Sequence, residues 1–257
     1  MFRKFTFIVT TFVLSALILS ACNLPGQGTI DTRSGVSQTD ISISTPTPAP
    51  SLCDNLYYPN TVGDTWEYAG STSATGAFAR TDTIANSSDK AFSVQSNLSD
   101  IIYMVDYSCT ESGLVVVNPI QQYLGAILNS LNGQVSLNLV SNSGISLPKE
   151  INPGDTWQQV VEWEGSAQGF STNGRLVFDY TAIGYETLTV SSVTFDALRV
   201  STTIQIEISD FKILYGTYNI ATWMAPNVGI IKSEGTSDVP NVDFSDSLEL
   251  IGFTVSP

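Results

Sequence analysis

Histidine is absent from the 257-residue sequence, and this absence removes several kinds of active site at once. Ser-His-Asp and Cys-His catalytic groups use an imidazole as the base, and many zinc sites use imidazole ligands. A Gly-x-Ser-x-Gly elbow and a phosphate-binding Gly-rich loop with Lys are also missing. Ser-x-x-Lys occurs three times, but no Lys-Thr-Gly accompanies it. The sequence therefore predicts a protein that is not an enzyme and has no cofactor.

Charged residues are also scarce, at 13% of the chain against about 25% in average proteins. The basic residues number 10 and the acidic residues 24. Such a surface repels phosphate backbones and anionic headgroups, so nucleic acid is not an expected partner. Ser, Thr, Val and Ile, which are common in this sequence, are typical of strands and the polar turns that join them.

Only one long stretch is almost wholly apolar, from Phe5 to Leu19. It follows Arg3 and Lys4, and it is shorter than the ~20 residues that a bilayer core requires. A basic start, a short apolar stretch and small residues before a cleavage point are typical of a secretory signal peptide. We therefore predict that residues 1–21 are a signal peptide, removed on export.

The stretch ends in Leu19-Ser20-Ala21-Cys22, which resembles the lipobox of bacterial lipoproteins. In that family the Cys carries a thioether-linked diacylglycerol and becomes the first residue of the mature chain. The resemblance implies that Cys22 is a lipidation site and not a catalytic thiol. It also implies that the domain faces the extracytoplasmic side of the cell envelope and contacts the membrane through this lipid. The mature chain keeps eight basic and 24 acidic residues, a net charge near −16.

Residues 22–50 are predicted to be the lipidated N-terminus followed by a disordered tether. The segment is rich in Gly, Ser, Thr and Pro and ends in Thr45-Pro46-Thr47-Pro48-Ala49-Pro50. Alternating prolines favour extended conformations without internal hydrogen bonds. An ordered first strand is the alternative.

Residues 51–257 are long enough for a single well-buried domain. Besides Cys22, this chain has two cysteines, Cys53 and Cys109. In an oxidising compartment a disulfide is the simplest account of such a pair, and two buried free thiols are the alternative. A metal site is not expected, because this pair provides too few ligands.

Alternating apolar and polar residues recur along the domain, separated by turn residues at regular intervals. This pattern predicts an all-β fold, mainly antiparallel, with a curved sheet that forms a half-barrel or a sandwich. The expected strands are Thr65–Tyr68, Lys90–Asn97, Ile101–Ser108, Leu114–Asn118, Gln134–Val140, Trp157–Trp163, Leu176–Ile183, Ala197–Ile208, Phe211–Trp223, Gly229–Glu234 and Ser247–Val255.

One segment has helical periodicity. Its apolar residues recur at spacings of three and four, after Pro119 and before Asn132-Gly133, which are helix start and stop signals. We predict a short amphipathic helix near residues 120–131 that covers the sheet or, alternatively, forms a lid over a cavity.

The sequence also contains a weak internal repeat. Val62-Gly63-Asp64-Thr65-Trp66 recurs as Pro153-Gly154-Asp155-Thr156-Trp157, which suggests two similar halves over residues 57–118 and 148–236. Gly and Asp suit a turn, and Trp suits the start of a core strand. A ligand-stacking role for Trp66 or Trp157 is the functional alternative.

Three segments resemble a group of uncharacterised secreted bacterial proteins of β-rich fold, many of them lipoproteins. The resemblance rests on residues 57–68, on residues 186–200 and on residues 222–232. The group usually has Pro-Ala-Gly where Ser191-Ser192-Val193 stand, and a different turn geometry is expected here because Val disfavours positive φ. It often has Gly at Asn227, and Asn tolerates the left-handed region. The resemblance implies a fold and an address, and it brings no catalytic residues.

Some acidic residues are candidates for chemistry. Glu162 and Glu164 share a strand face, and Glu67 adjoins Trp66; carboxylate pairs of this kind could serve a glycosidase, although exposed charges explain them equally well. Asp238, Asn241, Asp243 and Asp246 could offer oxygens to calcium, but the stretch lacks the Gly-bearing loop of known motifs. A solvated acidic loop is the expected interpretation.

Three hypotheses follow for the function of this extracytoplasmic domain. The first is a non-catalytic module that is displayed on a tether and binds a protein or a polysaccharide. The second is a carrier of a lipid or another apolar ligand in a β-lined cavity, and the third is a hydrolase that uses carboxylates. The partner itself is not predicted by any motif.

Overall fold

The computed structural model describes residues 51–99, 101–120, 135–167, 170–208, 216–238 and 243–256. Within these ranges most residues belong to one antiparallel sheet of 13 strands, as the all-β prediction expects. The strands are β1 (Thr65–Thr72), β2 (Gly76–Ser87), β3 (Ala91–Leu98), β4 (Ile101–Thr110), β5 (Gly113–Val116), β6 (Val135–Gly144), β7 (Leu147–Pro148), β8 (Thr156–Ala167), β9 (Phe170–Val190), β10 (Val193–Ile208), β11 (Gly216–Ala225), β12 (Gly229–Asp238) and β13 (Ser245–Thr254).

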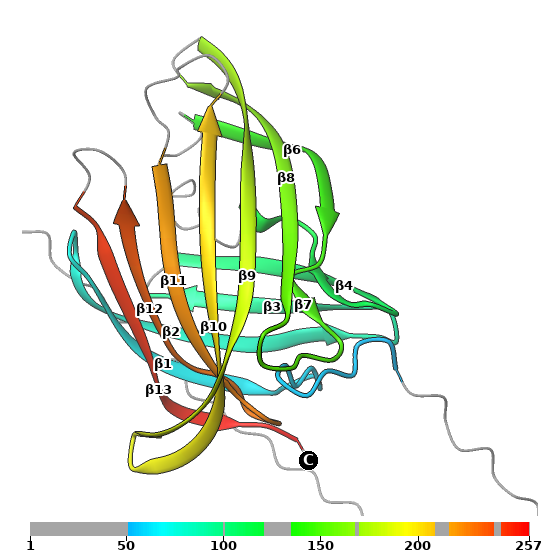
Figure 1. Ribbon diagram of the computed structural model, residues 1–257, viewed down its shortest axis with the longest axis vertical. Helices are drawn as coiled ribbons and strands as arrows, with labels where there is room; N and C mark the ends of the chain where they lie inside the picture. Colours follow the sequence, from blue (N-terminus) through cyan, green and yellow to red (C-terminus); the bar gives the residue numbers. More distant parts are fainter. Residues whose placement is uncertain are drawn as a thin grey trace, which may run out of the picture. The chain divides into compact units, whose positions relative to one another are not determined.

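The strand order is β6-β8-β9-β10-β11-β12-β13-β1-β2-β3-β4-β5-β7, so the sheet is open and β6 and β7 are its edges. The sheet is strongly curved, as Figure 1 shows. The register shifts at Arg199/Val200 between β9 and β10, at Trp223/Met224 between β11 and β12, and at Glu67/Tyr68 between β1 and β13 mark bulges in the sheet. A bulge bends and twists its strand, so these shifts help to curve the sheet.

The core fills the inner face of the sheet, which we define as the face that carries the buried apolar side chains. Alternate residues of each strand supply it: β4, for example, buries Tyr103, Val105 and Tyr107 and exposes the residues between them. Phe92 stacks on Tyr107 with ring centroids 4.5 Å apart, and Phe178 is fully buried in the other half. Period-two burial of this kind is what the alternating sequence predicts.

Strand β2 was not among the expected strands, and its inner face explains why. Arg80 and Asp82 stand where apolar residues would reveal the alternation. They form a bidentate ion pair, with Nε and Nη2 of Arg80 donating to Asp82 over 2.9 and 2.7 Å. The Ser96 hydroxyl adds a third hydrogen bond to Asp82, at 2.7 Å. A buried pair that is fully hydrogen-bonded takes the place of an apolar contact and hides the strand from a hydropathy pattern.

The two Gly-Asp-Thr-Trp segments form turns with the same hydrogen bonds. Gly63 and Gly154 both have φ of +93°, and no atom lies within 4 Å of a Cβ built on either one. In the first turn Asp64 Oδ2 accepts the Thr61 amide at 3.0 Å, and in the second Asp155 Oδ2 accepts the Asn152 amide at 2.7 Å. Glycine supplies the positive φ and aspartate closes the turn, so each Trp enters its strand on the inner face.

The strands that follow these turns repeat as well. β1 to β5 lie in chain order, and so do β8 to β12. The strand beside β1 on its other side is β13, and the strand in the same place beside β8 is β6. The sheet is thus two successive series of six strands, β6-β8-β9-β10-β11-β12 and β13-β1-β2-β3-β4-β5, with β7 added at the end.

A disulfide joins Cys53 to Cys109, so the predicted pairing is confirmed. It ties the segment that precedes β1 to the end of β4. The same segment is held by the Asn55 amide, which donates to the Pro148 carbonyl at 2.9 Å, and by the Leu56 carbonyl, which accepts the Asn227 amide at 2.7 Å. These contacts bring four distant parts of the chain together at one end of the core.

The β9–β10 hairpin turns through Ser191 and Ser192, which both have positive φ, at +46° and +72°. Two left-handed residues between paired strands are typical of a type I′ turn. Val193 begins β10, so this turn places no β-branched residue in the left-handed region. The hairpin reaches β13, where the Ser191 hydroxyl donates to the Leu250 carbonyl at 2.8 Å. Asn227 also takes positive φ, at +58°, as its side chain allows.

Two expectations fall partly or wholly outside the described ranges. The predicted helix near 120–131 lies outside them, apart from a helical assignment at Pro119 and Ile120. The predicted signal peptide, Cys22 and the predicted tether also lie outside the described residues. In the part of the chain that the structure describes, no helix has the length and apolarity needed to cross a membrane.

Candidate functional site

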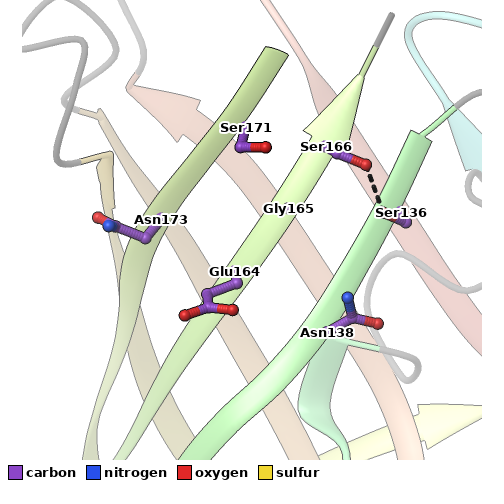
Figure 2. A pocket seen from close by; sticks show the side chains of 7 residues that line it. All are labelled: Ser136, Asn138, Glu164, Gly165, Ser166, Ser171 and Asn173. Carbon is purple, nitrogen blue, oxygen red and sulfur yellow. Dashed lines mark hydrogen bonds between the residues drawn. The ribbon is translucent and has the colours of Figure 1, made fainter. Parts of the chain in front are cut away.

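A polar hollow lies across β6, β8 and β9, on the side of the sheet opposite the core (Figure 2). Its volume is about 410 Å³, and its lining residues are Ser136, Asn138, Glu164, Gly165, Ser166, Ser171 and Asn173. Six of these seven side chains carry a hydroxyl, an amide or a carboxylate group. The hollow is open to solvent and has no aromatic or aliphatic side chain in its lining.

The hollow forms because polar residues alternate with apolar ones on three adjacent strands. Ser136 and Asn138 pair with Ser166 and Glu164 across β6 and β8. Ser171 and Asn173 pair with the same two residues across β8 and β9. Paired residues in an antiparallel sheet share a face, so two rows of three polar side chains meet there. The Ser136 and Ser166 hydroxyls hydrogen-bond at 2.8 Å.

Gly165 lies at the base of the hollow, where the core side of β8 has no room for a side chain. A Cβ at this position would lie 2.6 Å from Leu137 Cδ2 and 3.2 Å from the Trp163 ring, on the core side. These contacts are closer than carbon atoms tolerate. Glycine therefore lets Leu137 and Trp163 pack together beneath the hollow, and a larger residue would push β6 away from β8.

The carboxylates proposed from the sequence are not brought together as a facing pair. Glu164 is the one acidic residue in the lining. Glu162 lies on the same strand, where it accepts a hydrogen bond from Ser141 at 2.9 Å. Glu67 lies on β1, in the other series of strands. In the lining of the hollow no acid from a second element faces Glu164, so the arrangement lacks the opposed acid and base of a glycosidase.

The indole rings of the four tryptophans are not available as a stacking surface. Trp66, Trp163 and Trp223 are at most 7% exposed. Trp157 is partly buried and stacks on Tyr180 with ring centroids 5.2 Å apart, and its Nε1 donates to the Ser146 carbonyl at 3.2 Å. Packing in the core therefore accounts for Trp66 and Trp157, the two that follow the Gly-Asp-Thr turns.

Trp223 is held between two cations. Arg199 lies 5.2 Å from its ring centroid and Lys232 lies 5.0 Å from it. Its Nε1 donates to Glu186 at 2.7 Å, and Glu186 also pairs with Arg199 at 3.2 Å. The hydrogen bond from Trp223, helped by Arg199, holds the pKa of Glu186 below its usual range. The cluster links β9, β10, β11 and β12. Trp223 and Lys232 belong to residues 222–232, one of the three segments that carry the resemblance, and here they have a role in packing.

A second polar group lies at the border of the core, where three strands meet, with Asp82 buried and Arg80 partly exposed. It consists of the Arg80–Asp82 pair, Ser96 and the Tyr68 ring, over which Arg80 lies at 5.8 Å. Tyr68 donates to the Ile230 carbonyl at 3.1 Å, and burial raises the pKa of its hydroxyl far above the usual value. Because Nε and Nη2 of Arg80 and both carboxylate oxygens of Asp82 have hydrogen-bond partners, we assign the group to stability.

The acidic stretch is described only in part. Among its described residues, no group of three or more His, Cys, Asp or Glu side chains converges. Asp238, Asp243 and Asp246 are described and Asn241 is not. Asp246 instead turns toward Gly235, with its Oδ1 buried and without a hydrogen-bond partner. Burial raises the pKa of its carboxyl group.

The sequence alone does not identify the lining of the hollow. Ser and Asn are common in this chain, and no motif marks the ones that line the hollow. Glu164 is the one lining residue that the sequence analysis names as a candidate, as part of a carboxylate pair. The alternation over 134–140 predicts a strand, but the pairing of three separate strands decides which of its faces is hollowed.

No family model matches this chain, and a search of curated proteins finds no match. Solved structures do match its fold. A protein from Bacteroides fragilis, classed as exported and as having a YmcC-like fold, aligns with a TM-score of 0.54 at 13% identity, covering 78% of this chain and all of that one. A protein from Parabacteroides distasonis, classed as a lipoprotein, aligns with a TM-score of 0.54 at 16% identity, covering 79% and 99%.

A third structure, the hypothetical lipoprotein YmcC from Escherichia coli, aligns with a TM-score of 0.40 at 10% identity, covering 77% of this chain and 87% of that chain. Nothing is inferred from this weaker alignment. The first two likenesses show that the open 13-stranded sheet belongs to a fold already seen in bacterial proteins. At such low identity they show the fold alone.

Proposed function

We propose that the mature chain is anchored to a membrane by a lipid on Cys22, and that its β domain is a non-catalytic module that binds a polar polymer on the extracytoplasmic side. A neutral polysaccharide is one such polymer, and hydrogen bonds alone would hold it, because the tryptophan rings offer no stacking surface. The observation that carries the binding role is the polar hollow over β6, β8 and β9. The anchor rests on Leu19-Ser20-Ala21-Cys22 and on the apolar stretch before it.

Several observations support the proposed location outside the cytoplasm. The two structures with a TM-score of 0.54 are classed as an exported protein and as a lipoprotein. The Cys53–Cys109 disulfide suits an oxidising compartment outside the cytoplasm. A diacylated Cys supplies two acyl chains, which is the number that stable anchoring generally needs.

The chemistry of the hollow supports a neutral, hydroxyl-rich ligand. Ser136, Ser171 and Asn173 offer donors and acceptors without charge, and Glu164 adds one strong acceptor. A strongly acidic chain disfavours polyanions. The lack of apolar lining disfavours the carriage of a lipid in this hollow, since apolar ligands bind where apolar surface is removed from water. Hydrogen bonds along a sugar chain match two parallel rows of polar side chains.

Metabolic labelling tests the anchor. The full-length chain, expressed in a bacterium with a lipoprotein pathway, should incorporate labelled palmitate and fractionate with membranes. Cys22→Ser should abolish the label, while Cys53→Ser should keep it. A chain that is cut after Ala21 and carries no lipid would overturn the anchor without touching the fold.

Binding to neutral polysaccharides tests the role of the hollow. Immobilised glucans, mannans and galactans are suitable probes for the full mature chain in detergent. Asn138→Ala with Asn173→Ala should weaken retention about tenfold, because two hydrogen-bonding groups are lost. Asn97→Ala, an equally exposed amide on β3, is the matched control. Retention that the double variant leaves unchanged, or no retention by any glycan, would overturn the proposal.

A further inference from the structure

Among the residues that the structure describes, β6 is an edge strand with little of the usual protection. No described strand pairs with its outer edge. Its ten residues, Val135 to Gly144, include no charged residue and no proline. Natural edge strands commonly carry Lys or Pro or are covered, because their free N–H and C=O groups otherwise pair with another chain. A bulge near Val140 is the one protective feature that β6 shows.

The other half of the sheet shows what occupies the corresponding position. β13 takes the same place beside β1 that β6 takes beside β8. β13 pairs on both sides, with β1 and with β12. It also carries charges, Asp246 and Glu249, where β6 carries none. The fold therefore accommodates a strand on the side of β6 that is open.

Part of the β6 edge is already closed. The Asn142 side chain donates to the Val116 carbonyl at 2.8 Å, and it accepts a bond from Gln159 at 2.9 Å. Gln159, only 1% exposed, also accepts from Ser146 at 2.7 Å. This hydrogen-bonded group joins the two ends of the open sheet near the end of β6. The edge that is left for another strand therefore runs from residue 135 to residue 141.

The two faces of this open segment define the strand that would fit it. Leu137 and Leu139 are partly buried and pack on the core, while Ser136 and Asn138 are exposed and line the hollow. An added strand must therefore present apolar residues on one face and small polar residues on the other. β6 itself has this pattern, Val-Ser-Leu-Asn-Leu.

We propose that β6 pairs with β6 of a second copy, antiparallel about a two-fold axis perpendicular to the sheet. Such an interface is isologous, so each surface is its own complement. Leu137 and Leu139 then extend the apolar face across the axis, and Ser136 and Asn138 extend the polar face. The two polar hollows come to lie on the same side of one continuous sheet.

The charge distribution permits this pairing although the chain has a net charge of −14. The nearest acidic residues, Glu162 and Glu164, lie on β8, one strand inside the edge. Three strand spacings separate β8 from its symmetry mate, which is about 14 Å. The Debye length at physiological salt is about 8 Å, so their repulsion is largely screened. Charged residues on β6 itself would lie within the Debye length of their symmetry mates, and their repulsion would be screened less.

The contact is small, because it involves one short strand of each copy. It is therefore a weak dimer in dilute solution. If both copies are anchored as proposed above, confinement to one membrane raises their effective concentration and favours the pair. The tether of residues 23–50 spans up to about 90 Å when extended, so both copies reach the same membrane. The edge itself does not depend on the anchor.

Cysteine cross-linking of the full-length chain in membranes tests this inference. Ser136→Cys, Asn138→Cys and Ser141→Cys place thiols on the exposed face of β6, and Asn97→Cys places one equally exposed on β3. After mild oxidation, at least one β6 variant should give about tenfold more disulfide-linked homodimer than Asn97→Cys, because only the edge thiols are held together.

Pairs of different β6 variants should also follow an antiparallel register, in which the two residue numbers of each cross-linked pair have a constant sum. Adding Ser136→Lys and Asn138→Lys to Ser141→Cys should reduce its homodimer to the level of the control. The inference is overturned if all three β6 positions cross-link no better than Asn97→Cys, or if they cross-link to a different protein. It is also overturned if the lysines leave the dimer unchanged. Lipid-free chain secreted from residue 23 onward separates this result from failure of the anchor, since it should still dimerise weakly at high concentration.

Discussion

At the scale of single residues, the most informative side chains are polar groups that the fold buries. Asp82 is buried with Arg80 and Ser96 as partners, whereas Asp246 has a buried oxygen without one. The first arrangement replaces lost hydration with three hydrogen bonds, and the second does not. The hydrogen bonds of Asp82 thus offset the cost of its burial, whereas the burial of Asp246 lowers the stability of the fold.

Asp246→Asn should therefore stabilise the domain at neutral pH by about 1 kcal/mol, the lower end of the cost of an unpaired buried group. The raised pKa means that the folded chain binds this proton more tightly than the unfolded chain, so the stability of the wild type falls as pH rises from the ordinary value of Asp through the raised one. Urea unfolding of both proteins checks this. Their curves should converge near pH 3; a gap that is the same at pH 3 and pH 7 contradicts the assignment.

At the scale of elements, the two Gly-Asp-Thr-Trp turns offer a comparison within one molecule. Both aspartates close the same turn, but Asp64 is 1% exposed and also accepts the Ser256 amide at 2.8 Å. Asp155 is exposed and lacks a contact of this kind. The same four residues thus serve as a turn in one half and as a turn with a tertiary anchor in the other.

Asp64→Ala should lower the free energy of unfolding by about 3 kcal/mol and Asp155→Ala by about 1 kcal/mol. The first removes the hydrogen bonds from Thr61 and Ser256 to a buried carboxylate, whereas the second removes only exposed hydrogen bonds from Asn152. Denaturant unfolding of the two variants measures both values. Equal losses would show that the turn, and not the contact with Ser256, determines the role of Asp64.

The β9–β10 turn gives a second prediction at this scale. Ser192 adopts φ of +72°, which costs a residue with a Cβ about 1 kcal/mol. Ser192→Gly should therefore stabilise the domain by up to about 1 kcal/mol, less the added entropy of glycine in the unfolded chain. Ser191 is left in place, because its hydroxyl bonds Leu250. A thermal midpoint that falls in the Gly variant would refute the argument.

At the scale of the whole molecule, one disulfide links two parts of the chain that are far apart in the sequence. Cys53 and Cys109 are separated by 56 positions and join the segment before β1 to β4. In the chain-entropy model a loop of this length contributes about 4 kcal/mol by restricting the unfolded chain. The segment 51–63 is held by this link and by the hydrogen bonds from Asn55 to Pro148 and from Asn227 to Leu56.

Replacing both cysteines by Ala should thus lower the free energy of unfolding by about 4 kcal/mol and leave the strands in place. Far-UV circular dichroism tests the strands, and urea titration tests the free energy. Wild-type protein under a reducing agent should behave in the same way. A double variant as stable as the oxidised wild type would show that the loop is held by its other contacts.

Local sequence determined much of this protein. Period-two alternation marks most strands, as in β4, because one side of each strand is wet and the other dry. Two cysteines in a domain of exported type indicate a disulfide. Gly before Asp marks both turns, since only glycine takes φ of +93° without cost. Each of these properties depends on neighbours in the chain or on a single residue type.

Tertiary structure decided the rest. β2 is hidden from the sequence because Arg80 and Asp82 satisfy one another in the core, and that contact exists only after three strands pair. The hollow exists only because Ser136, Glu164 and Asn173, far apart in the chain, pair across β6, β8 and β9. The open edge of β6 follows from strand order, which alternation cannot specify: a strand has the same period whether it lies at the centre of a sheet or at its border.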